Sequence, residues 1–437
     1  MPRPSALYRI GIRLGSALLP VAALAGGKLG RAHRGRIGVL RRLETWGSAG
    51  REPHRPLVWF HAPSVGEGLQ AESVLARLRA RHPHWQIAYT YFSPSAGAFA
   101  ARLRERVGAE LADYLPYDTP GAVERTLDAL RPDALVFTKL DLWPELATAA
   151  AGRGIPVLLV AATVRPGSGR LRGPIRRLLA PGYAAVSRAG AISPEDAERL
   201  ASLGVAADRI EVTGDPRFDS VVERIAGLGP DDPLFRFGTG APTLVAGSTW
   251  PGDEGVLLRA FTRVRSHRPD ARLILVPHEP VPSHLDAIDR RAGRLGLPRP
   301  VRLGAADGPV PLLLVDRVGL LAKLYGAGAM AYVGGGFHRA GLHSVLEPAA
   351  WGIPVAFGPR WRESRDARLL VEAGGAEALE ESVEARAAER LAVLWEAWLV
   401  DERRRAAQGR AARRVVLEGA GAADRNAALV ERMVARA

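Results

Sequence analysis

Short runs of apolar residues alternate with amphipathic stretches along most of the 437-residue chain. Strands that alternate with helices in this way are typical of α/β domains built on parallel sheets. Helical patterns lie between the runs, for example at 69–81 and 121–130. The runs predict strands at 57–60, 86–91, 134–137, 156–162, 184–187 and 190–193, and then at 243–248, 272–277, 311–316, 329–336 and 354–358.

A segment rich in Gly, Pro and Asp, residues 227–242, separates these two series of strands and is predicted to be a linker. The chain is also long enough for two domains. We therefore expect two Rossmann-like, doubly wound α/β domains that face each other across a cleft. In such sheets ligands bind where strands end in loops. The expected parts are an N-terminal segment (1–36), a first domain (37–226), the linker, and a second domain with the C-terminal helices (243–437).

The chain has no cysteine, which excludes disulfides, thiolate metal sites and a cysteine nucleophile. Its formal net charge is +14, but 57 of its 60 basic residues are arginine, which points partly to GC-rich coding bias. Aromatic residues make up 6% of the chain and no recognition motif is present, so we expect no nucleic-acid partner.

The positive charge is concentrated near the N-terminus. Residues 1–55 contain eleven basic and two acidic residues, around an uncharged stretch at 14–27. A membrane-spanning helix needs about 20 apolar residues, and no clean cleavage site marks the stretch as a signal peptide. We expect residues 1–36 to associate with an anionic membrane surface. The alternative is a basic amphipathic helix that packs on the protein itself.

Glu67 follows the first predicted strand in a loop of small residues. With Ser64 it matches S-x-x-E, the capping box, in which each side chain bonds to the backbone at the other residue. The end of a strand, beside a helix N-terminus, would also suit an ionised general base. The pattern alone leaves both interpretations open.

A second candidate site lies within 329–359, where a predicted strand ends in three glycines. Such glycines let backbone N–H groups approach a phosphate, and a helix that begins near Ser344 favours an anion. Glu347 would accept hydrogen bonds from ribose hydroxyls; the alternative is a capped helix after a tight turn. His338 and His343 have no carboxylate at ligand spacing, so we expect no metal. The three glycines are Gly334, Gly335 and Gly336.

Two further segments have the composition of anion-binding loops. A Gly-Ser-Thr turn at the end of the strand predicted at 243–248 can bind phosphate, although it can equally be an N-capping turn. The segment 163–177 has five arginines and no acid, and is either a solvated loop or a platform for an anionic acceptor. The candidate residues are Gly247, Ser248 and Thr249 in the turn, and Arg165, Arg170 and Arg172 in the loop.

In order and over most of the chain, these segments resemble the Kdo (3-deoxy-D-manno-octulosonic acid) transferases of lipopolysaccharide synthesis. The resemblance implies an inverting glycosyltransferase of the GT-B type that moves Kdo from CMP-Kdo onto the lipid A precursor. The motifs that carry it are HAPSVGEGLQA (61–71), YLPYD (114–118), LWP (142–144), VTGDPRFD (212–219), AGSTWPGDE (246–254), LILVPHEP (273–280), GLLAKLYGAG (319–328) and the block from Gly334 to Val355.

The resemblance also implies roles for individual residues. Glu67 would be the general base for the acceptor hydroxyl, and no metal or redox cofactor would take part. The turn at 247–249 and the glycines at 334–336 would line the donor phosphate. CMP would lie near Pro277, His278, Gly319, Leu320, Leu321, His343, Ser344 and Glu347.

Four positions depart from the family pattern. The first acid before LWP, which the family uses near the reaction centre, is Lys139 here. The lysine of T-G-N-x-K-F-D is Arg217, which keeps the charge, and we expect both Lys139 and Arg217 in the catalytic machinery. The family's arginine after VP is His278, and its asparagine in H-N-x-L-E-P is Ser344.

We therefore expect a Kdo transferase at the cytoplasmic face of the bacterial inner membrane, with CMP-Kdo, the anionic lipid A precursor and the membrane surface as partners. One alternative is a related transferase with another sugar or acceptor. Another is a non-catalytic nucleotide- or lipid-binding relative, which the charge reversal at Lys139 favours. A nucleotide-sugar epimerase would not need the basic, apolar N-terminus.

Overall fold

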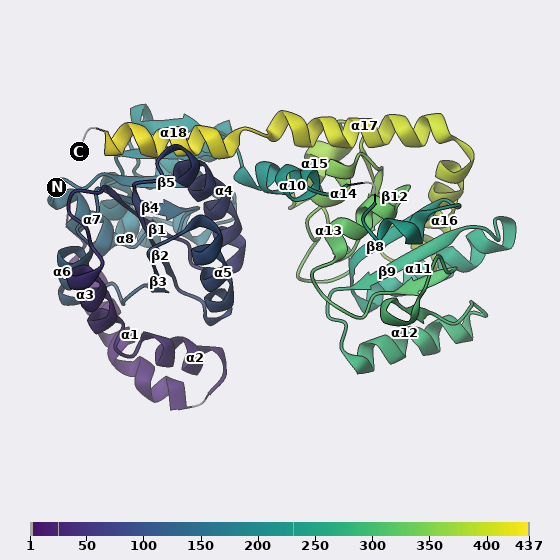
Figure 1. Cartoon of the computed structure of the whole chain (residues 1–437), viewed down its shortest axis with the longest axis horizontal. Coiled ribbons are helices and arrows are strands. Elements are labelled where there is room, and N and C mark those ends of the chain that lie inside the picture. The colour runs from purple at the N-terminus through teal and green to yellow at the C-terminus, as the bar shows by residue number, and fades with distance from the viewer. Residues whose placement is uncertain (1–2, 25, 230, 436–437) are drawn as a thin grey trace. The chain divides into compact units, whose positions relative to one another are not determined.

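The computed structural model describes residues 3–24, 26–229 and 231–435. It contains two seven-stranded parallel sheets, with strand orders β3-β2-β1-β4-β5-β6-β7 and β10-β11-β9-β8-β12-β13-β14. In each sheet the chain first moves outward in one direction and then returns to continue on the other side of its first central strand, as in doubly wound folds. The prediction of two Rossmann-like α/β domains is confirmed (Figure 1).

The bounds of the elements are as follows. The first sheet contains β1 (Leu57–His61), β2 (Gln86–Tyr91), β3 (Leu111–Tyr114), β4 (Ala134–Thr138), β5 (Val157–Ala162), β6 (Arg188–Ala191) and β7 (Ile210–Val212). The second contains β8 (Thr243–Thr249), β9 (Arg272–Pro277), β10 (Val301–Arg302), β11 (Leu312–Leu314), β12 (Met330–Val333), β13 (Val355–Phe357) and β14 (Ala376–Ala378). The helices up to the middle of the chain are α1 (Ala6–Leu24), α2 (Gly27–Arg36), α3 (Val39–Ala49), α4 (Val65–Arg81), α5 (Gly97–Val107), α6 (Pro120–Leu130), α7 (Pro144–Gly152), α8 (Gly173–Ala184), α9 (Pro194–Leu203) and α10 (Pro216–Ala226). The later helices are α11 (Pro251–His267), α12 (Pro282–Arg294), α13 (Leu321–Leu324), α14 (Leu346–Trp351), α15 (Arg365–Glu372), α16 (Glu384–Val400), α17 (Glu402–Gly419) and α18 (Ala422–Val434).

The chain divides into two compact units. The first unit runs up to Ser220 and includes the segment from Ala420 onward, and the second unit is Val221–Gly419. The C-terminal helix α18 therefore packs with the first sheet, beside α4, and not in the second domain, where we expected it (Figure 1). Its Leu429 and Val430 are buried in an apolar cluster with strands of the first sheet, and this burial accounts for the difference.

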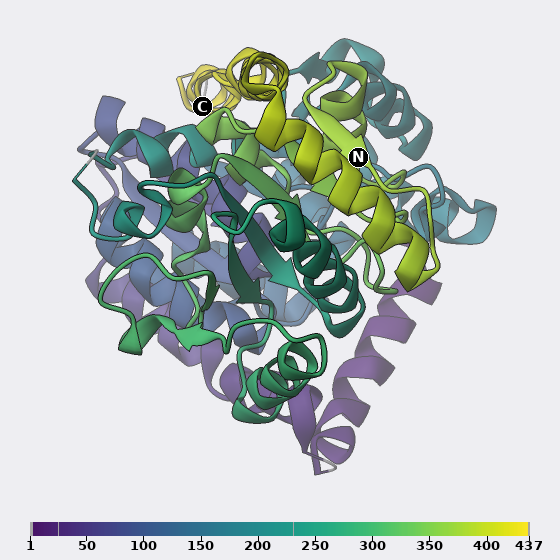
Figure 2. The same ribbon diagram turned by 90° about the vertical axis from the view of Figure 1, so that its right-hand side faces the viewer.

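The apolar runs of the sequence are the central strands of these sheets. Both faces of the first sheet are covered by helices, so all five residues of β1 and of β4 are buried. In the second unit α11 and α16 lie side by side on the sheet, and the rings of Phe261 and Trp395 stack with centroids 5.5 Å apart (Figure 2). A strand buried on both faces has no polar alternation, which explains why continuous runs predicted these strands correctly.

One predicted strand does not form, and several strands of the structure were not predicted. The strand expected at 184–187 does not form, because α8 continues to Ala184 and a turn leads from there to β6. Val186 is buried in that turn, so its apolar character reflects burial and not a strand. Four short strands were not predicted, and all of them have partly exposed residues and lie at sheet edges: β3, β7, β10 and β14. The helix start at Ser193 was predicted correctly, since its hydroxyl accepts the N–H of Asp196.

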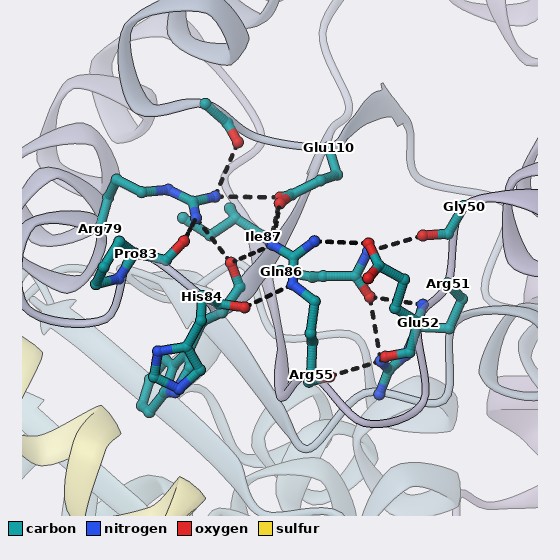
Figure 3. A network of polar contacts seen from close by, with 12 residues as sticks. Gly50, Arg51, Glu52, Arg55, Arg79, Pro83, His84, Gln86, Ile87 and Glu110 are labelled. Carbon is teal, nitrogen blue, oxygen red and sulfur yellow. Dashed lines mark hydrogen bonds and ion pairs between the residues drawn. The ribbon is translucent and has the colours of Figure 1, made fainter.

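A polar network ties together the amino-terminal ends of the strands in the first sheet (Figure 3). Gln86, the first residue of β2, accepts an N–H from Arg51 at 3.1 Å and donates to the carbonyl of Gly50 at 2.7 Å. Glu110, just before β3, binds Arg55 at 2.9 Å and Arg79 at 3.1 Å. We call these five residues, Arg51, Arg55, Arg79, Gln86 and Glu110, the amino-end network.

The N-terminal helix α1 has one anchored face and one apolar exposed face. Tyr8 donates to Asp118 at 2.7 Å, and Arg9 pairs with Glu145 at 2.7 Å. No helix in the described part of the chain is long and apolar enough to cross a membrane. The exposed face carries Leu7, Ile10, Leu14, Leu18, Val21 and Leu24, which are 54 to 86% exposed.

Candidate active site

Glu67 lies in the first turn of α4, directly after β1, where the strand order of the first sheet changes direction. Parallel α/β sheets bind their ligands at this switch point. The Ser64 hydroxyl donates to Oε2 of Glu67, and the Lys139 ammonium lies 2.9 Å from Oε1. The side chain of Glu67 is 18% exposed, so its carboxylate lies partly buried with both oxygens occupied.

The capping-box interpretation of Ser64 and Glu67 is wrong in this structure. Ser64 is the N-cap residue of α4, but its side chain makes no hydrogen bond to the helix backbone. Its hydroxyl is directed to the Glu67 carboxylate instead. The Ser64 hydroxyl at this helix start therefore orients a carboxylate and does not cap the helix backbone.

The Glu67 carboxyl group is held ionised. Burial by itself would raise its pKa, but the charge of Lys139 and the hydrogen bonds from Ser64 and Lys139 outweigh burial, so the pKa lies below its ordinary value. An ionised, oriented carboxylate at a ligand-binding edge has the properties of a general base. Lys139 weakens that base for as long as the two groups remain paired.

Lys139 reaches Glu67 from the adjacent strand. It follows β4, which pairs directly with β1, and its backbone adopts a left-handed conformation with φ 64°. Non-glycine residues rarely adopt this conformation outside sites that require it. The side chain is 36% exposed, so solvent reaches part of it.

Asp141 is a site residue that we did not predict. Its Oδ2 lies 3.1 Å from Nε2 of the fully buried His61 and 3.2 Å from the indole nitrogen of Trp143. Burial opposes ionisation of Asp141, but the contacts with His61, Trp143 and Arg170 outweigh it and lower the pKa. The signal was available, since Asp141 is the second acidic position before LWP and two residues from Lys139.

The predicted acceptor-binding arginines differ in their surroundings. Arg170 lies 3.8 Å from Asp141 and therefore belongs to the same carboxyl-end region as Glu67 and Lys139. Arg165 and Arg172 are exposed on the connection between β5 and α8. A loop with exposed arginines and no acid retains the features of an anion platform.

Arg217 binds the buried Asp215. Its guanidinium lies 2.6 Å from Oδ2 of Asp215, which also accepts from Gln70 on α4 through Oδ1 at 3.0 Å. Gln70 stands one turn after Glu67 on the same helix. Arg217 is thus connected to the face of α4 that carries the candidate base, through the buried Asp215.

In the second unit the predicted phosphate loops meet at the corresponding switch point, between β8 and β12. Ser248 has φ 52° at the end of β8, and Gly334 packs so closely that an added Cβ would lie 2.3 Å from the Ser248 carbonyl oxygen. The N–H groups of Gly334 and Gly335 are already bonded, to Gly247 O at 2.8 Å and to Asp253 at 2.9 Å. These glycines serve close packing, so two of their N–H groups do not point freely toward a phosphate.

Aromatic rings gather at the same edge of the second sheet. The ring of His338 stacks on Trp250 with centroids 4.0 Å apart, and His278 lies 4.8 Å from Trp250. The indole N–H donates to Nε2 of His343 at 2.9 Å. Burial, followed by the neighbouring His278 and His338, lowers the pKa of His343 to about 4, so this ring is neutral and accepts the bond. Trp250 was not predicted as a site residue.

The helix after the glycine loop starts later than we expected. The N-cap of α14 is Val345, while Ser344 is exposed, so the prediction that Ser344 begins this helix is wrong. Glu347 is hydrogen-bonded to Arg224; burial raises its pKa and the arginine opposes this rise.

The other predicted donor residues lie near the same switch point or close to it in the chain. Leu321 lies beside Gly247. Within the described residues no cluster of histidine and acidic side chains is arranged to hold a metal ion. The remaining predicted donor residues end β9 or precede α13: Pro277, Gly319 and Leu320.

The comparisons with known proteins bear on both units. A family model described as 3-deoxy-D-manno-octulosonic-acid transferase (kdotransferase) matches residues 34–220. The 3-deoxy-D-manno-octulosonic acid transferase of Bordetella pertussis is 30% identical over 345 residues, which are 76% of this chain and 78% of the relative. The chain belongs to this family. The Haemophilus influenzae enzyme of the same name is 27% identical over 90% of this chain and 91% of its own length.

Solved structures of similar fold are more distant. UDP-GlcNAc 2-epimerase from Neisseria meningitidis, bound to UDP-GlcNAc, has a TM-score of 0.58 at 13% identity and covers 84% of this chain and 99% of its own. A glycosyltransferase from Rickettsia africae has a TM-score of 0.57 at 12% identity, covering 87% and 97%. At such identities the likeness shows the fold alone, which is shared by transferases and epimerases.

Proposed function

We propose that this protein transfers Kdo from CMP-Kdo to the anionic lipid A precursor with inversion at the anomeric carbon. The observation that carries the proposal is Glu67, an ionised carboxylate oriented by Ser64 at the switch point of the first sheet. Membership of the Kdo transferase family supports the choice of sugar. The first unit would bind the acceptor and the second unit the donor.

In the proposed reaction Glu67 takes the proton from the acceptor hydroxyl as that oxygen attacks the anomeric carbon of Kdo. The bond between the anomeric carbon and the phosphate oxygen breaks, and CMP leaves with the electron pair. Donors and dipoles that meet the developing charge lower this barrier. The connection from Arg217 through Asp215 and Gln70 supports Arg217 as a positioning residue on the acceptor side.

The donor site is proposed at the carboxyl ends of β8 and β12. Ser248, Thr249, Gly336 and the cluster of Trp250 with three histidines would surround the phosphate and sugar. Neutral His343 fits a neutral hydrogen-bonding role in this cluster. The reaction as proposed needs neither a metal nor a redox cofactor, since the phosphate monoester is already an adequate leaving group.

The first unit is proposed to work at the cytoplasmic face of the bacterial inner membrane. The apolar face of α1 is exposed along the helix, while Tyr8 and Arg9 on the helix bind Asp118 and Glu145. A helix with this division and basic neighbours lies in a bilayer interface and attracts anionic lipids. Such docking would bring the acceptor lipid to the first unit.

The direct test is incubation of the protein with CMP-Kdo and tetra-acylated lipid A precursor, followed by mass spectrometry of the lipid. We expect a mass increase of one or more Kdo units that disappears when CMP-Kdo is omitted or replaced by a UDP-sugar. CMP, and not a UDP-sugar, should raise the melting temperature. Protection by UDP-sugars without transfer of Kdo would contradict the proposal and point to another sugar or acceptor.

One observation favours a second candidate, a non-catalytic nucleotide- or lipid-binding relative. Lys139 occupies Oε1 of Glu67, the atom that would receive the proton, and replaces an acid of the family. This candidate predicts protection by CMP with no transfer to any lipid. The incubation above separates the two candidates, because only a transferase changes the mass of the acceptor.

A further inference from the structure

Both oxygens of the candidate base are occupied inside the first unit. Oε1 pairs with the Lys139 ammonium at 2.9 Å, and Oε2 accepts the Ser64 hydroxyl. Each carboxylate oxygen can still accept a second hydrogen bond, but the adjacent ammonium charge lowers the basicity of Glu67, so the carboxylate takes a proton more readily once this partner has moved away. The partner that moves determines when the base becomes available.

Lys139 is the partner that is able to leave. Ser64 is fixed at the start of α4, three residues from Glu67, and has one rotatable bond to its hydroxyl. Lys139 has a flexible four-carbon stem, ends in a compact charge and is 36% exposed. Solvent reaches part of this side chain, so the ammonium exchanges one anionic partner for another at a modest cost.

The surroundings decide what would draw Lys139 away. The neighbouring carboxylate, Asp141, is already bonded to His61 and Trp143 and lies close to Arg170. The connection from β5 to α8 contributes exposed arginines, Arg165 and Arg172, and no acid over 163–177. The nearby charge therefore favours an anion from outside the protein, such as a phosphate group of the acceptor.

We propose that Lys139 is an anion-responsive latch on Glu67, which holds the base until a phosphate group of the acceptor takes over the lysine ammonium. This inference rests on the proposed transfer reaction. When the phosphate binds Lys139, Oε1 is free; the acceptor O–H bond then breaks, its proton moves to Oε1, and the oxygen bonds to the anomeric carbon while CMP leaves. The latch makes Lys139 a specificity-determining residue that couples acceptor charge to base activity.

The kinetic test combines two acceptors with two proteins. The acceptors are the lipid A precursor and the same lipid after removal of its phosphate groups, and the proteins are the native chain and Lys139→Met. In the native protein the dephosphorylated lipid should lose much of its kcat/KM. In Lys139→Met this penalty should be smaller by about fivefold or more, since the base no longer waits for an anion.

Two further variants separate the latch from general effects of charge or folding. Methionine keeps the length of the stem and keeps a non-glycine residue at φ 64°, so the melting temperature should change little. Lys139→Arg should preserve the native penalty. Arg153→Met, at a surface arginine that pairs with Asp128 at 2.8 Å, should also preserve it. An equal penalty in the native protein and in Lys139→Met would overturn the latch.

A second readout does not depend on transfer. Carbon-13 NMR of the Glu67 carboxyl group, assigned by its loss in Glu67→Gln, reports its titration midpoint with and without inorganic phosphate. Phosphate should raise the midpoint in the native protein and leave it unchanged in Lys139→Met. If the protein transfers no Kdo but shows this difference, the proposed function fails and the latch stands. If phosphate moves neither midpoint, the latch fails whatever the activity.

Discussion

The two ends of the first sheet use polar residues in opposite ways. At the amino end, the network of Arg51, Arg55, Arg79, Gln86 and Glu110 satisfies its groups internally, largely with backbone carbonyls (Figure 3). At the carboxyl end lie Glu67, Lys139 and Asp141. The backbone of Lys139 has a left-handed conformation, and its ammonium forms an ion pair with the Glu67 carboxylate that solvent partly reaches.

Some buried polar groups near the carboxyl end of the first sheet have no hydrogen-bond partner. Within the described residues, Gln70 Oε1, Tyr89 Oη and Thr138 Oγ1 are buried without a hydrogen-bond partner. Thr138 precedes Lys139, Gln70 follows Glu67 on α4, and a Cβ at Gly68 would lie 2.9 Å from Tyr89 Oη. A buried polar group without a partner costs free energy. One end of the sheet is therefore built for stability, while the other carries unfavourable contributions to stability that suit a binding site.

Two glutamates give the largest expected contrast. Glu67→Gln should lower Kdo transfer by about a thousandfold, equivalent to about 4 kcal/mol in the barrier, because the amide cannot accept the proton. Its melting temperature should change little. Glu110→Gln should instead weaken two ion pairs at the amino end, lowering stability by about 1–2 kcal/mol without changing transfer per folded molecule. Full transfer by Glu67→Gln would remove the case for a base.

The contribution of the amino-end network to stability is best tested at Arg51, which is 8% exposed. Arg51→Met keeps the apolar stem but removes the hydrogen bonds that Arg51 donates to the Leu130 carbonyl, the Gln86 side chain and Asp133. We expect a loss of about 3 kcal/mol, measured by urea unfolding. Arg153→Met, at the exposed surface, is the matched control and should cost less than about 1 kcal/mol. Similar losses in both variants would contradict a stabilising role for the network.

The fold was largely predictable because its central strands are buried on both faces. Such strands are continuous apolar runs, and β1, β4 and β8 were found in this way. Short strands with exposed residues, such as β7, carry little of this signal. The place of α18 could not be predicted, because an amphipathic pattern shows that a helix face is buried and not which sheet covers it.

The sequence predicted where the candidate site residues lie in the fold, but not which side chains they contact. Glu67 was recognised from its place after β1, whereas its pairing with Lys139, 72 residues later, requires that β1 and β4 be neighbours. Both S-x-x-E patterns were misleading as capping signals. At Ser64 the hydroxyl binds the carboxylate, and Ser344 lies exposed before the N-cap of α14. Spacing identifies residues that can meet, while tertiary packing selects the bond that forms.

A smaller effect tests the unpartnered groups of the carboxyl end. Thr138→Val removes a buried hydroxyl without a partner, keeps the shape of the side chain and suits a strand, so stability should rise by about 1 kcal/mol. Thr90→Val on β2, which is separated from β4 by β1, is the matched control. Thr90 Oγ1 accepts the Trp59 indole N–H at 2.9 Å, so this change should destabilise by a similar amount. Equal signs in a urea-unfolding comparison would show that the hydroxyl of Thr138 is not a cost.

The smallest expected effect concerns the stability that the Glu67–Lys139 pair adds at the carboxyl end. Because the pKa of Glu67 is lower in the folded protein than its ordinary value of 4.5, the added stability is fully present above that value. It is lost as the pH falls through the folded pKa and the carboxylate is protonated. Lys139 is about a third exposed, so solvent screening limits the pair to about 0.5 kcal/mol. Urea unfolding should therefore show Lys139→Met to be less stable than the native protein at about pH 7, and the difference should be smaller at about pH 3. The effect of Thr138→Val, which removes no charge, should be the same at both pH values. A constant deficit for Lys139→Met would mean that the lysine stem, and not its charge, contributes the stability.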